Sequence, residues 1–307
     1  SRLMELARRY PGAVVAMEAG CHSPWFSRYL EGLKCRVTVS NPRKVRAIYQ
    51  QERKSARRDA LMLARIARME PALLYPIRHG SEEAQQDLLR NKLRDSLVRA
   101  RVAPINSVRF TLKSLGYQVR NPSSERFHKV GMEEVPEALG RMIAPSVQAP
   151  AELTERIKVL EREISELARS KYPQTAWLQQ IPGVGPITAL YFVLKIEDPS
   201  RFEKVRDVGA FVGLCPRRDQ SGESDPQLRI TKRGDTYLRR LLVSGAQYIL
   251  GPFGPKSALR QYGLDLAADG TTRSKKRAVV AVARKLAVLL LSLWKNHSQY
   301  QPFPQPA

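Results

Sequence analysis

Two serines with basic residues on both sides stand in the stretch from residue 209 to 245. Ser221 and Ser224 lie in the polar segment SGES. A serine hydroxyl among fixed cations can act as a nucleophile toward a phosphate, because cations stabilise the negative charge that develops during attack. The neighbouring basic side chains, which we expect to bind nucleic acid, are Arg217, Arg218, Arg229, Lys232, Arg233, Arg239 and Arg240. The plainer alternative is a solvated Ser/Gly loop, which is what most such segments are.

Activation of such a serine needs help from outside the loop. Asp219, Glu223 and Asp225 weaken the local positive field. No histidine occurs between residues 129 and 296, so a local Ser–His pair is excluded. We therefore expect activation to come from a cation, a metal ion, or a base in another domain or subunit.

Two carboxylates in the amino-terminal part form a second candidate constellation. Glu18 follows a predicted strand, and Asp59 lies on a predicted helix that could pass the end of that strand. In nucleases of the RNase H kind, carboxylates placed in this way gather one or two magnesium ions for phosphoryl transfer. From spacing alone, a surface role for Glu18 and an intrahelical arginine partner for Asp59 are the favoured alternatives.

The remaining metal-binding residue types are scattered. Cys21, Cys35 and Cys215 have no metal-ligand spacing, and their odd number argues against a disulfide framework. The four histidines are also far apart in sequence. We expect no zinc site, and a reducing, cytoplasmic setting.

Charge points to a polyanionic partner. The 307 residues carry a net charge of +23 and have a pI of about 10.3, an excess that a solvated surface does not require. Hydrophobic residues make up 43% of the chain, which is enough for real cores. The apolar run 278–294 is interrupted by Arg284 and Lys285, so we expect an amphipathic core helix there and no membrane span.

The amino-terminal third has the rhythm of a parallel α/β unit. Its pattern predicts a helix over 1–10, a strand over 13–17, a helix over 25–33 and a strand over 35–39. The chain opens with helix before any strand, so we expect a preceding strand to be missing. Residues 43–70 then predict a helix with a one-signed basic excess, which favours phosphate contact. From that helix we expect nucleic-acid contacts by Arg43, Lys44, Arg57 and Arg58.

Long helices follow. Residues 81–115 predict a helix that Pro104 kinks or interrupts, and a second long helix begins at Pro150 with a short heptad seam. We expect these helices to pair, within the chain or between subunits. The segment IPGVGP at 181–186 resembles a helix-hairpin-helix turn, in which Gly183 and Gly185 allow N–H groups to hold a DNA phosphate. A Gly-rich turn that packs two helices is an equal alternative.

These patterns predict an α/β plus α protein with four regions. Residues 1–78 are expected to form a partial α/β domain of the RNase H kind, and residues 79–172 a helical, coiled-coil dimerisation region. Residues 173–300 form a mainly helical DNA-binding domain that carries the hairpin-like motif and the serine loop. The proline-containing tail 301–307 is expected to be disordered.

Several motifs together resemble one known family, the bridge-RNA-guided insertion-sequence transposases, which pair a RuvC-like DEDD domain with a serine-bearing transposase domain. The matching segments run through most of the chain. They are VVAMEAGCHSPWFSRYL at 14–30, VSNPRKVR at 39–46, KSARRDALMLARIA at 54–67, IPGVGPITA at 181–189, VGAFVGLCPRRDQSGES at 208–224 and RITKRGDTYLRRLLV at 229–243.

The resemblance implies DNA strand exchange in a site shared between subunits of a dimer or tetramer. A structured bridge RNA would pair with both donor and target DNA. Ser221 matches the nucleophile, which would form a transient phosphoserine link. Glu18 matches the glutamate of the family's carboxylate tetrad and Asp59 its last aspartate, with Mg²⁺ bound between them. The implied location is the prokaryotic cytoplasm, with the nucleoid.

Two departures from the family pattern stand out. The family has an aspartate three residues before the last one, where this chain has Ala56, and its first aspartate precedes the start of this chain. We therefore expect a transposase or recombinase with an impaired metal site. The alternatives are a catalytically inactive protein that retains DNA and RNA binding, and a junction-resolving nuclease without serine chemistry.

Overall fold

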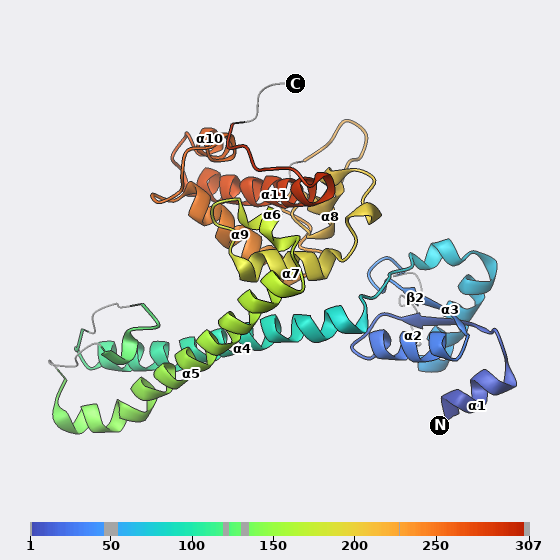
Figure 1. Cartoon of the computed structure of the whole chain (residues 1–307), viewed down its shortest axis with the longest axis horizontal. Helices are drawn as coiled ribbons and strands as arrows, with labels where there is room; N and C mark the ends of the chain where they lie inside the picture. The colour runs from blue at the N-terminus through green and yellow to red at the C-terminus, as the bar shows by residue number, and fades with distance from the viewer. Residues whose placement is uncertain (1, 46–54, 119–122, 130–134, 227, 304–307) are drawn as a thin grey trace. The chain divides into compact units, whose positions relative to one another are not determined.

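A computed structural model of the chain describes residues 2–45, 55–118, 123–129, 135–226 and 228–303. The chain divides into two compact units, residues 1–85 and 86–307 (Figure 1). The four-region boundaries expected from the sequence remain a prediction, because the helical middle and the carboxy-terminal region fall within one of these units.

The first unit is built on two parallel strands. Strand β1 (Val14–Glu18) pairs with β2 (Arg36–Ser40), and the register sets Glu18 opposite Ser40. Helix α2 (Ser23–Gly32) connects them as the crossover. The predicted strand–helix–strand unit is therefore confirmed, with each strand displaced by one residue. Glu18 is the last residue of its strand rather than the residue after it.

Helices cover both faces of this small sheet. On one face, Val15, Met17 and Val37 pack with buried residues of α1 (Arg2–Arg9) and α2. On the other face, Ala16 packs with Leu63 and the rest of a cluster on α3 (Ala56–Met69) and the short helix η2 (Pro71–Leu74). The alternation of side chains along β1 therefore decides which residues face α3.

The helix expected over residues 43–70 is shorter in the structure. Residues 42–44 form a turn, residues 46–54 lie outside the described part, and the helix begins at Ala56. The side chain of Ser55 accepts a hydrogen bond from the N–H of Arg58 at 3.3 Å, which is the geometry of a helix N-cap. A strong cap thus fixes the helix start, whereas the Arg- and Ala-rich pattern only predicts helical character.

Two long helices open the second unit. Helix α4 (Glu82–Ser114) runs through Pro104 without interruption, because the turns around it are held by buried neighbours. Helix α5 (Glu137–Ser170) begins well before the predicted start at Pro150 and contains Pro145 as well. Both corrections have the same cause. Tertiary packing outweighs the helix-breaking tendency of an internal proline.

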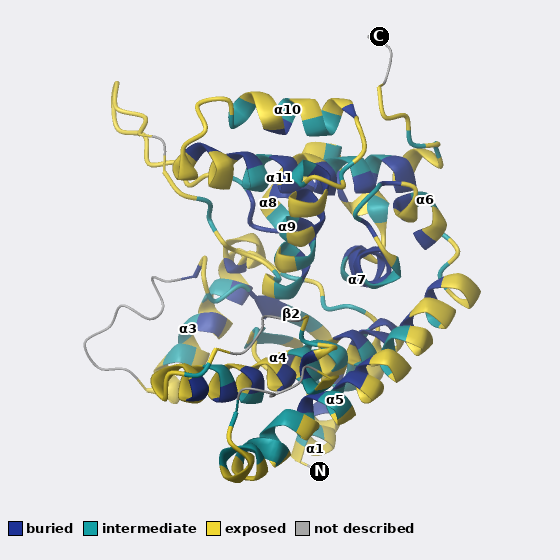
Figure 2. Cartoon of the chain, turned by 90° about the vertical axis from the view of Figure 1, so that its left-hand side faces the viewer, coloured by how far each residue is buried: buried dark blue, intermediate teal, exposed yellow. Residues whose placement is uncertain are grey.

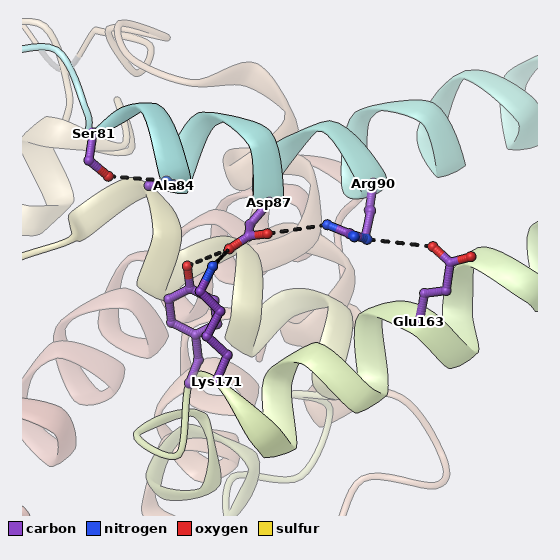
Figure 3. Close-up of polar contacts among 7 residues, drawn as sticks. Ser81, Ala84, Asp87, Arg90, Glu163 and Lys171 are labelled. Atoms are coloured by element: carbon purple, nitrogen blue, oxygen red, sulfur yellow. Dashed lines mark hydrogen bonds and ion pairs between the residues drawn. The ribbon is translucent and has the colours of Figure 1, made fainter.

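Polar contacts hold α4 against α5 in an antiparallel pairing within the chain. Asp87, whose side chain is 8% exposed, accepts hydrogen bonds from Lys171 Nζ (2.6 Å) and Tyr172 Oη (2.7 Å), as Figure 3 shows in part. Arg90 bridges Asp87 and Glu163 on the opposite helix. Burial alone would raise the pKa of Asp87, but these donors hold it below its ordinary value.

Further along the pair, contacts change from ionic to apolar. Arg101 donates to Thr154 Oγ1 at 3.0 Å within the buried seam. Beyond it, Ile105, Val108 and Leu112 of α4 pack with Phe127 of the short helix η3 (Phe127–Lys129) and with the first half of α5. Of the heptad positions expected to form a seam, Ile157 and Ile164 are buried.

The carboxy-terminal helices share a core centred on α11. They are α6 (Thr175–Gln179), α7 (Pro186–Ile196), α8 (Val208–Phe211), α9 (Thr236–Leu250), α10 (Ala258–Leu266) and α11 (Thr272–Asn296), with the short helices η4 (Pro199–Arg201) and η5 (Val205–Asp207). Buried residues of α11 recur every three or four positions, for example Val282, Leu286 and Leu290, all at 0% exposure. Helix α7 is buried on almost every side (Figure 2).

Two further predictions concern the apolar helix and the tail. No helix among the described residues is both long and apolar enough to cross a membrane. In the tail, the carbonyl of Pro302 accepts a hydrogen bond from the N–H of Ala258 at 2.8 Å, so residues 301–303 are held on α10. The expected disorder of residues 304–307 lies outside the described part.

Candidate functional site

Ser221 stands at the tip of an irregular hairpin between α8 and α9. The N–H of Ser221 donates to the carbonyl of Ser224, and the N–H of Ser224 donates back to Ser221, both at 3.0 Å. Gly222, with a φ of 56°, takes the first position of the two-residue turn between them, as in a type II′ turn. The segment protrudes beside α8 and is exposed (Figures 1 and 2). Both serine hydroxyls are therefore open to an external substrate.

The base of this hairpin is closely interlocked. Pro216 and Ile230 form an antiparallel bridge, and the N–H of Thr231 donates to the carbonyl of Cys215 at 2.9 Å. A Cβ at Gly234 would lie 2.0 Å from the carbonyl oxygen of Phe211, and the residue has a φ of 86°. Only glycine fits that approach, so the two ends of the hairpin meet at a fixed point.

Arg239 on α9 ties the same base together. Its Nη1 donates to the carbonyls of Val212 (3.1 Å) and Arg233 (3.2 Å), and its Nη2 donates to Thr236 Oγ1 (3.2 Å). Arginine donors in this position connect the two arms of the hairpin. The side chain that we expected to bind nucleic acid is thus already engaged within the protein, and its contact with nucleic acid stays a prediction.

Asp235 begins α9 directly after the hairpin. Its carboxylate accepts the N–H groups of Tyr237 and Leu238 (both 2.9 Å), the hydroxyl of Tyr191 (3.1 Å) and an ion pair from Lys195 (3.2 Å). Burial would raise the pKa of Asp235, but the Leu238 N–H and Lys195 outweigh it and lower that pKa. The same burial, with the nearby Asp235 charge, raises the pKa of Tyr191 far above its ordinary value.

The other basic residues predicted around Ser221 fall into two groups. Arg217, Arg218, Arg229, Lys232 and Arg233 are exposed on the hairpin arms, where Arg218 forms a 3.6 Å ion pair with Asp225. Arg240 differs from them. It pairs with Asp95 of α4 at 2.6 Å, and its guanidinium lies over the ring of Tyr237. The structure therefore collects five exposed cations near the serines.

The glycine turn before α7 contacts another helix. A Cβ at Gly183, whose φ is 88°, would lie 3.0 Å from the carbonyl oxygen of Gly245 and from the Tyr248 ring on α9. This close approach fits the alternative of a packing turn for Gly183. Gly185 is exposed and forms the N-cap of α7. Phosphate contact by Gly183 and Gly185 stays a prediction.

In the first unit, Glu18 and Asp59 belong to facing layers. Glu18 alternates onto the face of β1 that carries Ala16, and Asp59 lies one helical turn before Leu63, which packs on that face. Glu18 is exposed and Asp59 half-buried. Among the described residues, no group of three or more His, Cys, Asp or Glu side chains is arranged to hold a metal ion. The two carboxylates therefore do not fit a complete divalent-metal site.

The predicted basic residues of the first unit lie on either side of the undescribed segment 46–54. Arg43 and Lys44 are exposed in the turn after β2, where Lys44 Nζ lies 4.6 Å from the centre of the Tyr75 ring. Arg57 and Arg58 are exposed in the first turn of α3. Their contact with nucleic acid stays a prediction.

Comparison with known proteins places the chain among DNA-mobilising proteins. A model of DEDD transposases of the IS110 type matches residues 3–116, and a model described as the transposase IS116/IS110/IS902 family matches residues 175–262. The second match contains the Ser221 hairpin and α9.

Full-length relatives agree with both matches. A transposase for insertion sequence element IS1111A from Coxiella burnetii is 28% identical over 94% of this chain and 79% of its own length. A probable family 20 transposase from Pseudomonas aeruginosa is 29% identical over 98% of this chain and 90% of its own length. A transposase for insertion sequence element IS1328 from Yersinia enterocolitica is 31% identical over 80% of this chain and 73% of its own length.

The chain is thus similar throughout to transposases of insertion sequences. It belongs to the IS116/IS110/IS902 family. DNA is consequently a partner, and the DEDD type of the amino-terminal match indicates a divalent metal in the family.

The sequence patterns pointed to Ser221 but not to the residues that position its hairpin. Asp235 was not singled out, although an Asp directly before a helix is a standard N-cap signal that could have identified it. A Cβ at Gly213 would lie 1.8 Å from the carbonyl oxygen of Arg233, an approach between segments some twenty positions apart, like that of Gly234 to Phe211, which no local pattern reveals.

Proposed function

We propose that this transposase moves DNA by strand exchange through Ser221, guided by a structured RNA. The observation that carries the proposal is the placement of Ser221 at an exposed hairpin tip, with five exposed cations on the arms leading to it. A hydroxyl on a fixed backbone among cations suits attack on a phosphodiester. RNA guidance and a dimeric or tetrameric assembly rest on the family resemblance of the motifs.

The proposed step conserves the phosphodiester bond energy. The Ser221 Oγ–phosphorus bond forms as the bond between phosphorus and one sugar oxygen breaks. The serine hydroxyl loses its proton, and the released sugar oxygen takes up a proton to become a hydroxyl. Attack of another strand's hydroxyl on the phosphoserine link reverses these changes and restores the free serine. The arginines of the hairpin would neutralise the charge that develops on the non-bridging oxygens.

Ser221 is preferred to Ser224 because of its neighbours. Ser221 follows the arm that carries Arg217 and Arg218, whereas Ser224 is followed directly by Asp225, a carboxylate that opposes charge build-up on phosphate. Ser221→Ala should abolish a covalent protein–DNA product while DNA affinity is retained. Ser224→Ala is the matched control and should preserve that product. Unchanged product in the Ser221→Ala chain would exclude the serine role.

A second candidate is a family member that binds nucleic acid without cleaving it. The observation in its favour is Ala56, which stands one helical turn before Asp59, so that the described residues supply fewer than three ligands there. Recombination assays with donor, target, guide RNA and magnesium separate the two candidates. Binding without cleavage, both in the chain with Ala56 and in an Ala56→Asp chain, would support the binding-only protein.

A further inference from the structure

Three arginines follow one face of α11 toward the Ser221 hairpin. Arg273, Arg277 and Arg284 are spaced by four and seven residues, so they fall within about 40° of one another around the helix axis. All three are exposed. They extend over about 16 Å of helix, at 1.5 Å per residue. We call this set the α11 arginine face.

The α11 arginine face ends at the base of the hairpin. A Cβ at Gly209 would lie 3.1 Å from Arg284 Cγ and 3.2 Å from its Nε, with Cys215 Sγ at 3.5 Å. Arg284 therefore lies over Gly209 beside Cys215, whose carbonyl holds the other arm of the hairpin through Thr231. The α11 arginine face thus reaches the foot of the arm that carries Arg217 and Arg218.

Nothing within the fold accounts for these charges. Among described residues, none of the three guanidinium groups donates a hydrogen bond or forms an ion pair. Asp269 lies in the field of Arg277, but its carboxylate is engaged by Thr271 and Ser274, which with lesser help from Arg277 lower its pKa. Cations near the start of a helix also oppose the helix dipole. Exposed guanidinium groups that no described carboxylate pairs with are suited to contact an external anion.

We propose that the α11 arginine face binds the phosphate backbone of a DNA strand and leads that strand to Ser221. Its length corresponds to about five phosphate steps at 3.4 Å per step. DNA is favoured over RNA because the face ends at the hairpin whose proposed target is a DNA phosphodiester. This inference rests on the proposed function, and it adds a surface outside the hairpin.

The test measures how DNA affinity depends on salt. Binding of a short fluorescent duplex DNA is followed by anisotropy across a salt series for the full chain, for Arg277→Gln/Arg284→Gln, and for the control Arg156→Gln/Arg162→Gln. The control removes two exposed cations from α5. Each lost phosphate contact lowers the slope of log affinity against log salt by about 0.9, so the α11 variant should lose about 2 from the slope. The control should keep the slope of the natural chain.

Each of three outcomes would overturn the proposal. The first is an unchanged slope and affinity in the α11 variant, and the second is an equal loss in the control. The third is an unchanged DNA slope with weakened binding of an RNA of the same sequence, which would assign the face to RNA. Arg277→Lys/Arg284→Lys keeps the charge and should keep the slope, so a loss there would mean a structural role. Ser221→Ala should leave the slope unchanged, which separates this test from that of the serine.

Discussion

Removal of the Asp235 carboxylate tests how the Ser221 hairpin is anchored. Asp235→Ala removes the cap of α9, which costs about 1 kcal/mol. It also leaves the hydroxyl of Tyr191, a residue 1% exposed, without its acceptor, which costs about 1–3 kcal/mol. Loss of the ion pair between Asp235 and the partly exposed Lys195 should add little to this cost in unfolding free energy. We expect the second unit to lose about 2–4 kcal/mol of unfolding free energy.

The assay must report on the second unit alone. In a Trp25→Phe background, the remaining tryptophans are Trp177 and Trp294, both in that unit. Urea unfolding followed by their fluorescence gives the midpoint for Asp235→Ala and for the control Asp265→Ala, an exposed carboxylate on α10. The control should change stability by less than about 0.5 kcal/mol. An equal shift in both variants would refute the anchoring role.

The pH dependence of this effect has a definite sign. The pKa of Asp235 is lowered in the folded state, so its ionised form contributes stability above the unfolded value of about 4. That contribution is lost as the pH falls through the lower folded pKa. The difference in unfolding free energy between the natural chain and Asp235→Ala should therefore be largest at neutral pH and shrink in acid. A difference that grows toward acid would contradict the assignment.

Three further predictions concern other parts of the account. Gly234→Ala places a Cβ 2.0 Å from a carbonyl oxygen, so hydrogen exchange of the hairpin base should rise sharply, whereas Gly270→Ala, with open space around it, should leave that exchange unchanged. Asp87→Ala leaves Lys171 and the Tyr172 hydroxyl without their shared acceptor and should lower the unfolding free energy by about 2–4 kcal/mol in the same fluorescence assay. Ala56→Asp adds a carboxylate one turn before Asp59 and should raise Mg²⁺ affinity in calorimetry; no gain would argue against a shared ligand position.

The sequence predicted correctly those strands and helices that depend on the pattern of neighbouring residues. The apolar runs around Ala16 and Val37 gave both strands and their parallel pairing, because a buried two-sided sheet requires such runs. The predicted start of α5 at Pro150 was wrong. Prolines such as Pro145 and Pro150 usually mark helix boundaries, but here the preceding turns pack on α4 and stay helical. The start of α3 depended on a single capping side chain, Ser55.

In the candidate site, too, residues within one segment could be predicted, whereas residues that act through distant contacts could not. Ser221 and its arginines were predicted as a site because charge and residue type are visible in one segment, and this stays a prediction. Their positioning was not predicted, because Asp235 acts through Tyr191, and Gly213 and Gly234 act through close approaches to Arg233 and Phe211, all distant in sequence. The function of the carboxylates could not be decided from spacing, and among the described residues the structure brings together too few ligands to complete a metal site.

The central claim is that Ser221 becomes covalently joined to DNA during strand exchange. The most direct measurement is mass spectrometry of protein–DNA adducts trapped by denaturation from a reaction with donor, target, guide RNA and magnesium, followed by protease and nuclease digestion. We expect a nucleotide phosphate on the peptide that contains Ser221, located on that residue and absent from the Ser221→Ala chain. Recombined DNA without any adduct, or an adduct on Ser224 or elsewhere, would contradict it.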